Sequence, residues 1–247
     1  MDQLQTSEAR AVAGVVKDWL RSSVSVAALT GAGISAESGI PTFRGPGGVW
    51  KTYRAEDLAT PEGFARDPKL VWEWYDWRRS VIATAQPNAG HRALVEIERR
   101  VPRFTLITQN VDGLHDRAGG VSVLKVHGDI WTLRCTSCER ERRDLRPRLE
   151  QVPPHCSCGG MQRPGVVWFG EGLPDAIWEE AVRSTREADL FLVIGTSAVV
   201  HPVAGLVYLA KSSGAKVVEI NIDDTPVSSA VDIRWRTSAA EALPALL

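Results

Sequence analysis

The stretch Val24-Ser25-Val26-Ala27-Ala28-Leu29-Thr30-Gly31-Ala32-Gly33-Ile34-Ser35-Ala36 decides the fold. Its first half is a short apolar run, which predicts a buried strand. Its second half fits the pattern G-x-G-x-x-G/A, in which one glycine permits a tight turn and the next lets backbone approach a pyrophosphate, while the following helix offers free N–H groups. We therefore predict a strand, a turn and a helix that bind a dinucleotide. The simpler alternative is a strand-to-helix turn without a ligand.

Apolar runs and helical stretches alternate along most of the chain. Near-continuous apolar runs predict buried strands, and the helical periodicity between many of them predicts covering helices. This alternation is typical of an α/β fold with a Rossmann-like, doubly wound parallel sheet. The predicted strands are 24–29, 104–107, 123–126, 190–194 and 216–220, and the predicted helices are 8–19, 91–100, 177–188 and 203–213.

Two segments interrupt this alternation. Residues 44–79 are rich in Gly, Pro and Trp and then helical, with no strand where the second strand of a dinucleotide-binding fold is expected. Residues 131–164 are charged and contain all four cysteines. We predict that both segments are insertions that form a smaller zinc-binding domain, whereas residues 1–43, 80–130 and 165–247 form the Rossmann-like core.

The overall composition excludes several classes of protein. The chain has 247 residues, 44% of them hydrophobic, and a net charge of −1, so it lacks the positive field that gathers nucleic acid. Its N-terminus lacks the basic and apolar segments of a secretion signal, and no apolar run is long enough to cross a bilayer. We expect a cytoplasmic protein, a monomer, that binds neither nucleic acid nor membrane.

The four cysteines have the spacing of a metal site. Cys135 and Cys138 are separated by two residues, and Cys156 and Cys158 by one. Four thiolates bind Zn²⁺ tetrahedrally and leave no open position for water, so we predict one structural zinc ion. The alternatives are buried or redox-active cysteines and a zinc ribbon that binds nucleic acid. Acidic residues interleave with the nearby arginines, which favours a solvated surface over the ribbon.

Polar residues follow several predicted strands, at the sheet edge where doubly wound folds place their sites. The segment 108–115 is polar, and His127-Gly128 ends the next strand, where a histidine with a pKa of about 6.5 suits a general base. A structural histidine is the alternative. No acidic residue ends a second strand about 20 residues after the glycine turn, which argues against an ordinary dehydrogenase.

Over essentially its whole length the chain resembles the sirtuins. The resemblance implies a Rossmann-like domain and a small zinc domain, between which NAD and an acyl-lysine peptide meet. The motifs that carry the resemblance are Gly31-Ala32-Gly33-Ile34-Ser35, Ile40-Pro41-Thr42-Phe43-Arg44, Thr108-Gln109-Asn110-Val111-Asp112, His127-Gly128, the cysteine pairs, Val167-Trp168-Phe169-Gly170-Glu171, Gly195-Thr196-Ser197 and Asn221.

The same resemblance implies that NAD is consumed as a co-substrate. His127 is expected to deprotonate a ribose hydroxyl, while Asn110 and Asp112 hold the nicotinamide end in a reactive geometry. The implied products are nicotinamide, O-acyl-ADP-ribose and free lysine. The residues implied to bind NAD are Gly31, Ala32, Gly33, Ile34, Thr42, Phe43, Arg44, Gln109, Asn110, Val111, Asp112, Gly195, Thr196, Ser197, Asn221, Ile222, Asp223 and Ala239. Those implied to bind the peptide strand are Val167, Trp168, Phe169, Gly170 and Glu171.

One further motif concerns the acyl group. Tyr75 and Arg78 resemble the Tyr-x-x-Arg motif of the desuccinylase class of sirtuins, and Ala59 lies where that class has a small residue that widens the pocket. Three residues apart on a helix, Tyr75 and Arg78 share a face, so a carboxylate can bind to both. We therefore predict removal of succinyl and malonyl groups, and also of acetyl groups. The alternative is a Tyr-Arg pair with a purely structural role.

Three rival functions come from other classes. An NAD-dependent oxidoreductase has no use for the four-cysteine insertion, and a zinc-ribbon binding module does not explain the glycine turn. A mono-ADP-ribosyltransferase shares the NAD chemistry but transfers ADP-ribose to a protein, so only its products distinguish it from a deacylase.

Overall fold

The computed structural model describes residues 2–42, 49–50 and 53–247. Its largest sheet has six strands in the order β11-β10-β9-β1-β4-β5, and every neighbouring pair is parallel. The chain starts at the centre of this sheet, builds one edge and then returns to build the other, which confirms the predicted doubly wound, Rossmann-like topology. The strands are β1 (Ser25–Thr30), β4 (Arg103–Thr108), β5 (Val123–Lys125), β9 (Leu190–Ile194), β10 (Lys216–Asn221) and β11 (Ile233–Arg236).

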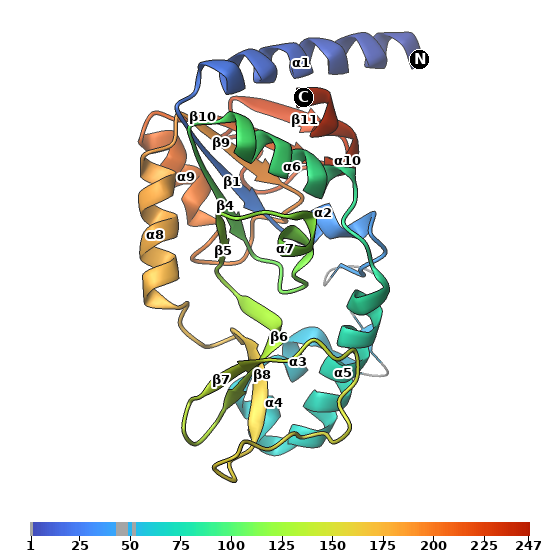
Figure 1. Cartoon of the computed structure of the whole chain (residues 1–247). Helices are drawn as coiled ribbons and strands as arrows, with labels where there is room; N and C mark the ends of the chain where they lie inside the picture. The colour runs from blue at the N-terminus through green and yellow to red at the C-terminus, as the bar shows by residue number, and fades with distance from the viewer. Residues whose placement is uncertain (1, 43–48, 51–52) are drawn as a thin grey trace.

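Helices cover both faces of this sheet (Figure 1). Val26 and Ala28 of β1 pack in a core with residues of α1 (Asp2–Ser22), α6 (Ala89–Arg100) and α10 (Ala239–Ala242). Ala27 and Leu29 point to the opposite face, where α8 (Asp175–Arg186) and α9 (Gly205–Ser212) pack. Because both faces are buried, the central strand reads as a continuous apolar run.

The two insertions pack against each other beside the large sheet (Figure 1). The first contributes α3 (Ala55–Leu58), α4 (Pro61–Arg66) and α5 (Pro68–Thr84), after the short hairpin of β2 (Val49–Trp50) and β3 (Tyr53–Arg54). The second lies around an antiparallel sheet in the order β7-β6-β8, made of β6 (Gly128–Cys135), β7 (Glu141–Arg143) and β8 (Gln162–Val166). Apolar residues of both insertions, with Trp72 at 0% exposure, form one core. The domain boundaries given above stay a prediction.

Some elements differ from the sequence-based expectation. The helix after the glycine turn is the single turn α2 (Gly33–Ala36), not an extended helix, and the first helix is longer at both ends than predicted. Strand β11 and the small sheet were not predicted, and β11 has only four residues, too few for a clear pattern. The remaining elements are α7 (Leu114–Ala118) and the 3-10 helix η2 (Pro244–Leu246). Among the described helices, none combines the length and apolar character needed to span a bilayer.

Candidate active site

A cavity of about 1020 Å³ opens between the carboxyl edge of the large sheet and the small sheet with its helices. It lies beside the ends of β1 and β9, where the strand order reverses and doubly wound folds bind their ligands. Most of the predicted site residues line it. They are Gly31, Ala32, Gly33, Thr42, Ala59, Tyr75, Arg78, Gln109, Asn110, Val111, His127, Val167, Trp168, Phe169, Gly170, Glu171, Gly195, Thr196, Ser197, Asn221, Ile222, Asp223 and Ala239.

Close backbone contact between the ends of β1 and β9 explains the glycines. Gly31 N–H donates to the Ile194 carbonyl at 3.0 Å, and Gly33 N–H donates to the Gly195 carbonyl at 2.7 Å. A Cβ atom on Gly33 would lie 2.7 Å from both the Cα and the carbonyl oxygen of Gly195, which itself has φ +55. The glycines therefore let two strand ends meet at the cavity floor. This packing requires glycine in addition to any approach of a ligand.

Side-chain amides tie the strand ends together. Asn110 Nδ2 donates to the Gly31 carbonyl at 2.9 Å, and Gln109 Nε2 donates to Thr196 Oγ1 at 2.8 Å. Asn221 Nδ2 donates to the Thr196 carbonyl at 2.8 Å. These bonds orient the amides, and because the Asn110 side-chain nitrogen is the donor, its side-chain oxygen can accept from a group in the cavity.

His127 is held in one tautomer. Its Nδ1 lies 3.1 Å from the Gln109 carbonyl oxygen, which only accepts, so Nδ1 carries the hydrogen and the lone pair is on Nε2. Burial lowers the pKa of His127 below its ordinary value. The imidazole is therefore neutral at pH 7 and able to accept a proton at Nε2, as a general base must.

The small-domain end of the cavity contains the Tyr-x-x-Arg pair. Tyr75 and Arg78 lie on α5 and line the cavity together with Ala59. Tyr75 is 2% exposed, and burial raises its pKa to about 12, against the opposing effect of Arg78. The Arg78 guanidinium lies 5.1 Å from the centre of the Trp74 ring. A buried phenol and a half-buried guanidinium thus share one wall of the cavity, which suits a carboxylate-bearing group.

Known proteins match this chain along most of its length. A model of the Sir2 family matches residues 31–202. A protein from Aquifex aeolicus (strain VF5) named NAD-dependent protein deacylase is 53% identical over 90% of this chain and 93% of its own length. This chain belongs to the Sir2 family. A relative named NAD-dependent protein deacylase 2, from Pyrobaculum aerophilum, is 51% identical over 94% of this chain and 93% of its own length.

Solved Sir2 structures superpose closely. A complex of a Sir2 homologue with NAD is 46% identical and has a TM-score of 0.90, over 94% of this chain and 91% of that one. A complex of Sir2 with a p53 peptide and NAD⁺ is 32% identical and has a TM-score of 0.84, over 92% and 93% of the two chains. These comparisons confirm the family that the sequence motifs indicated.

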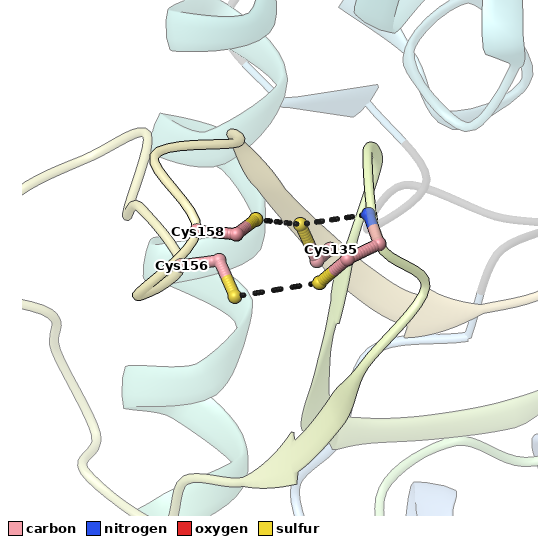
Figure 2. Close-up of side chains that lie close together, drawn as sticks. Cys135, Cys156 and Cys158 are labelled. Atoms are coloured by element: carbon pink, nitrogen blue, oxygen red, sulfur yellow. Dashed lines mark hydrogen bonds between the residues drawn. The ribbon is translucent and has the colours of Figure 1, made fainter.

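The four cysteines of this Sir2 member form one cluster. Their sulfur atoms lie within 4.8 Å of one another, and Figure 2 shows Cys135, at the end of β6, converging with Cys156 and Cys158 from the loop before β8. The Cys135–Cys158 and Cys138–Cys156 sulfur distances are 3.5 and 3.8 Å. Tetrahedral zinc with Zn–S bonds of about 2.3 Å places its sulfurs about 3.8 Å apart, so this cluster fits a structural zinc ion. The single residue between Cys156 and Cys158 does not prevent convergence.

Three groups of predicted site residues need separate comment. Ile34 and Asp112, 0% and 4% exposed, do not line the cavity but lie behind its wall, because Ile34 packs in the sheet core and Asp112 binds Ser35. Phe43 and Arg44 lie outside the described residues. The peptide-binding role of 167–171 stays a prediction, although Phe169, 46% exposed, lies at the rim.

Sequence reasoning missed a buried polar network beneath the cavity. Ser35 Oγ donates to Asp112 at 2.8 Å and lies 3.5 Å from His91 Nε2, while His115 Nε2 lies 3.0 Å from Thr30 Oγ1. The His91 and His115 rings are 4.8 Å apart. Burial lowers their pKa values to about 4 and about 3. Thr30, a buried polar residue at the end of β1, was the available signal.

Several residues that complete the cavity wall were not predicted from the sequence. Trp178 of α8, the loop residues 199–202 and Ser238 all line it. Glu37 lines it as well and accepts from Ser238 Oγ at 3.1 Å, which fixes the start of α10 beside the cavity. These contacts join parts of the chain about 200 residues apart, so no local pattern predicts them.

Proposed function

We propose that this protein is an NAD-dependent protein-lysine deacylase. The supporting observation is that a single cavity contains the glycine turn at the strand crossover, a neutral histidine and the Tyr75–Arg78 pair. The close relatives carry the name NAD-dependent protein deacylase, and related structures hold NAD or a peptide. When bound, NAD would lose nicotinamide, and its ADP-ribose would be transferred to the acyl oxygen.

The residues of this chain supply positioning and proton transfer. The glycine turn lets the diphosphate approach backbone at the ends of β1 and β9, and Asn110 orients the nicotinamide end. Asp112 acts from behind the wall by holding Ser35. His127 Nε2 accepts a proton from a ribose hydroxyl, and its Nδ1–H stays bound to the Gln109 carbonyl, which stabilises the charged imidazolium. With one water molecule consumed, the products are nicotinamide, O-acyl-ADP-ribose and free lysine.

The acyl pocket favours short acidic groups. A succinyl or malonyl carboxylate can accept from the Arg78 guanidinium and the Tyr75 hydroxyl, and Ala59 leaves room for it. An acetyl group has no carboxylate, so it accepts no hydrogen bond from the Arg78 guanidinium or the Tyr75 hydroxyl. We therefore infer a preference for succinyl and malonyl lysine, with acetyl lysine as a slower substrate.

Mass-spectrometric product analysis tests both parts. Matched succinyl-lysine and acetyl-lysine peptides are incubated with NAD and the intact protein, His127→Ala or Arg78→Met. We expect nicotinamide and succinyl-ADP-ribose from the intact protein and none from His127→Ala. Arg78→Met should lose at least tenfold in kcat/KM on the succinyl peptide, since a charged hydrogen-bonded contact is worth about 1.5–3 kcal/mol, and much less on the acetyl peptide.

Other outcomes decide against parts of the proposal. Equal rates on both peptides that Arg78→Met does not change would make Tyr75 and Arg78 structural. ADP-ribose attached to protein, without acyl-ADP-ribose, would indicate the ADP-ribosyltransferase instead. A monomeric state, a cytoplasmic location and the lack of nucleic-acid or membrane binding remain proposals, and the near-neutral net charge bears only on the last of these.

A further inference from the structure

The Tyr75 hydroxyl has a defined hydrogen-bond donor in the cavity wall. The indole Nε1–H of Trp168, which follows β8, donates to Tyr75 Oη at 3.0 Å. Trp168 is 3% exposed and Tyr75 is 2% exposed. Because an indole nitrogen only donates, Oη is the acceptor in this bond, and the phenol's own hydrogen is not used in it. The bond thereby restricts where the hydroxyl hydrogen can point.

The indole itself is fixed by a charged pair. The Arg163 guanidinium carbon lies 3.4 Å from the centre of the Trp168 ring. Arg163 donates to both carboxylate oxygens of Glu171, at 2.5 and 2.8 Å, and Glu171 accepts from the Trp168 backbone N–H at 2.8 Å. The Phe64 ring packs against the indole at 5.2 Å between ring centres. Rotation of the indole would break its stacking on the Arg163 guanidinium, which the bidentate bonds to Glu171 hold in place.

We propose that Trp168 is a specificity-determining positioning residue, which holds the Tyr75 hydroxyl as a donor toward the carboxylate of an acidic acyl group. Arg163 and Glu171 hold the indole in the orientation that this requires. The Tyr75 phenol is protonated at neutral pH, as an ordinary tyrosine is, and burial raises its pKa further, to about 12. The inference rests on the proposed preference for acidic acyl groups and assigns part of that preference to a residue that makes no contact of its own with the carboxylate.

A double-mutant cycle tests the inference. Trp168→Phe removes the N–H but keeps an aromatic ring against Arg163 and Phe64, and Tyr75→Phe removes its acceptor. Steady-state kinetics on matched succinyl-lysine and acetyl-lysine peptides give the ratio of their kcat/KM values. Trp168→Phe should lower this ratio about fivefold, the equivalent of one hydrogen bond of about 1 kcal/mol, through a higher KM for the succinyl peptide. In the Tyr75→Phe background the same change should alter the ratio less than twofold.

A second variant avoids substitution in the pocket itself. Arg163→Met should also lower the ratio, and only when Tyr75 is present. Its control is Arg103→Met, because Arg103 also pairs with a carboxylate, that of Glu187, but is exposed and lies at the start of β4, at the opposite end of the large sheet from the cavity. Arg103→Met should leave the ratio unchanged.

Two patterns would overturn the inference. Equal losses on both peptides, or effects of Trp168→Phe and Tyr75→Phe that simply multiply, would make Trp168 a packing residue while the succinyl preference of the intact protein stands. An intact protein that prefers the acetyl peptide would instead refute the proposed acyl preference, and this inference with it. The intact-protein measurement therefore separates the two failures.

Discussion

At the residue scale, Gly33 shows how a single missing Cβ supports the site. A Cβ there would lie 2.7 Å from backbone atoms of Gly195, and backbone cannot move aside as a flexible side chain can. We expect Gly33→Ala to destabilise the fold by about 1–3 kcal/mol and to raise the KM for NAD at least tenfold. The matched control is Gly14→Ala in α1, where a new Cβ meets nothing within 4 Å and alanine favours the helix. Thermal unfolding and NAD titration check this. If Gly33→Ala unfolds and binds NAD as the intact protein does, the close contact with Gly195 does not exist.

At the element scale, Arg79 joins α5 to the second insertion. Fully buried, it donates to the carbonyls of Ile130, Asp144 and Arg146 and pairs with the Asp144 carboxylate at 3.3 Å. Hydrogen bonds from Arg146 hold the pKa of Asp144 well below its usual value, so Asp144 stays charged. Arg79→Met leaves these acceptors buried without their donor, and we expect a loss of about 3–5 kcal/mol in the free energy of unfolding.

Urea unfolding measures this loss, with Arg183→Met in α8 as the control. Arg183 also pairs with a carboxylate, that of Glu180, but at the surface, so its removal should hardly change the midpoint. Similar midpoints for both variants would show that α5 and the second insertion are held together by their apolar core alone. Because α5 also carries Tyr75 and Arg78, the anchor at Arg79 bears on the acyl pocket.

At the scale of the whole molecule, the limits of sequence reasoning follow from the range of the contacts. The sheet, the glycine turn and the cysteine cluster were predictable because each depends on local spacing or on the rule that parallel strands end at one edge. The packing of Trp72 against the small sheet was not, because an apolar residue does not specify its partner. Nor was the link between Trp168 and Tyr75, which are 93 residues apart.

Two histidines that long-range packing buries together predict how the stability of the fold depends on pH. His91 and His115 come from different helices and share one buried site, which lowers their pKa values to about 4 and about 3, from about 6.5 in the unfolded chain. The unfolded state therefore binds more protons below pH 6.5, so their contribution is complete above that pH and is lost as the pH falls toward 4. We expect this pair to lower the free energy of unfolding by roughly 2–3 kcal/mol between pH 7 and pH 5.5. His127, whose pKa burial also lowers, adds to the fall.

Urea unfolding across this pH range, for the intact protein and for His115→Asn, provides the measurement. Asparagine keeps a polar group near Thr30 but does not titrate, so about half of the loss that His91 and His115 cause together should disappear in that variant. Asp144 does not interfere, because its carboxylate takes up protons in the unfolded chain only near pH 4, and Asp112, whose pKa burial raises, acts in the opposite direction. A free energy of unfolding that stays constant down to pH 5.5 would mean that the two imidazoles gain protons without leaving the folded structure, and hence that water reaches the network beneath the cavity.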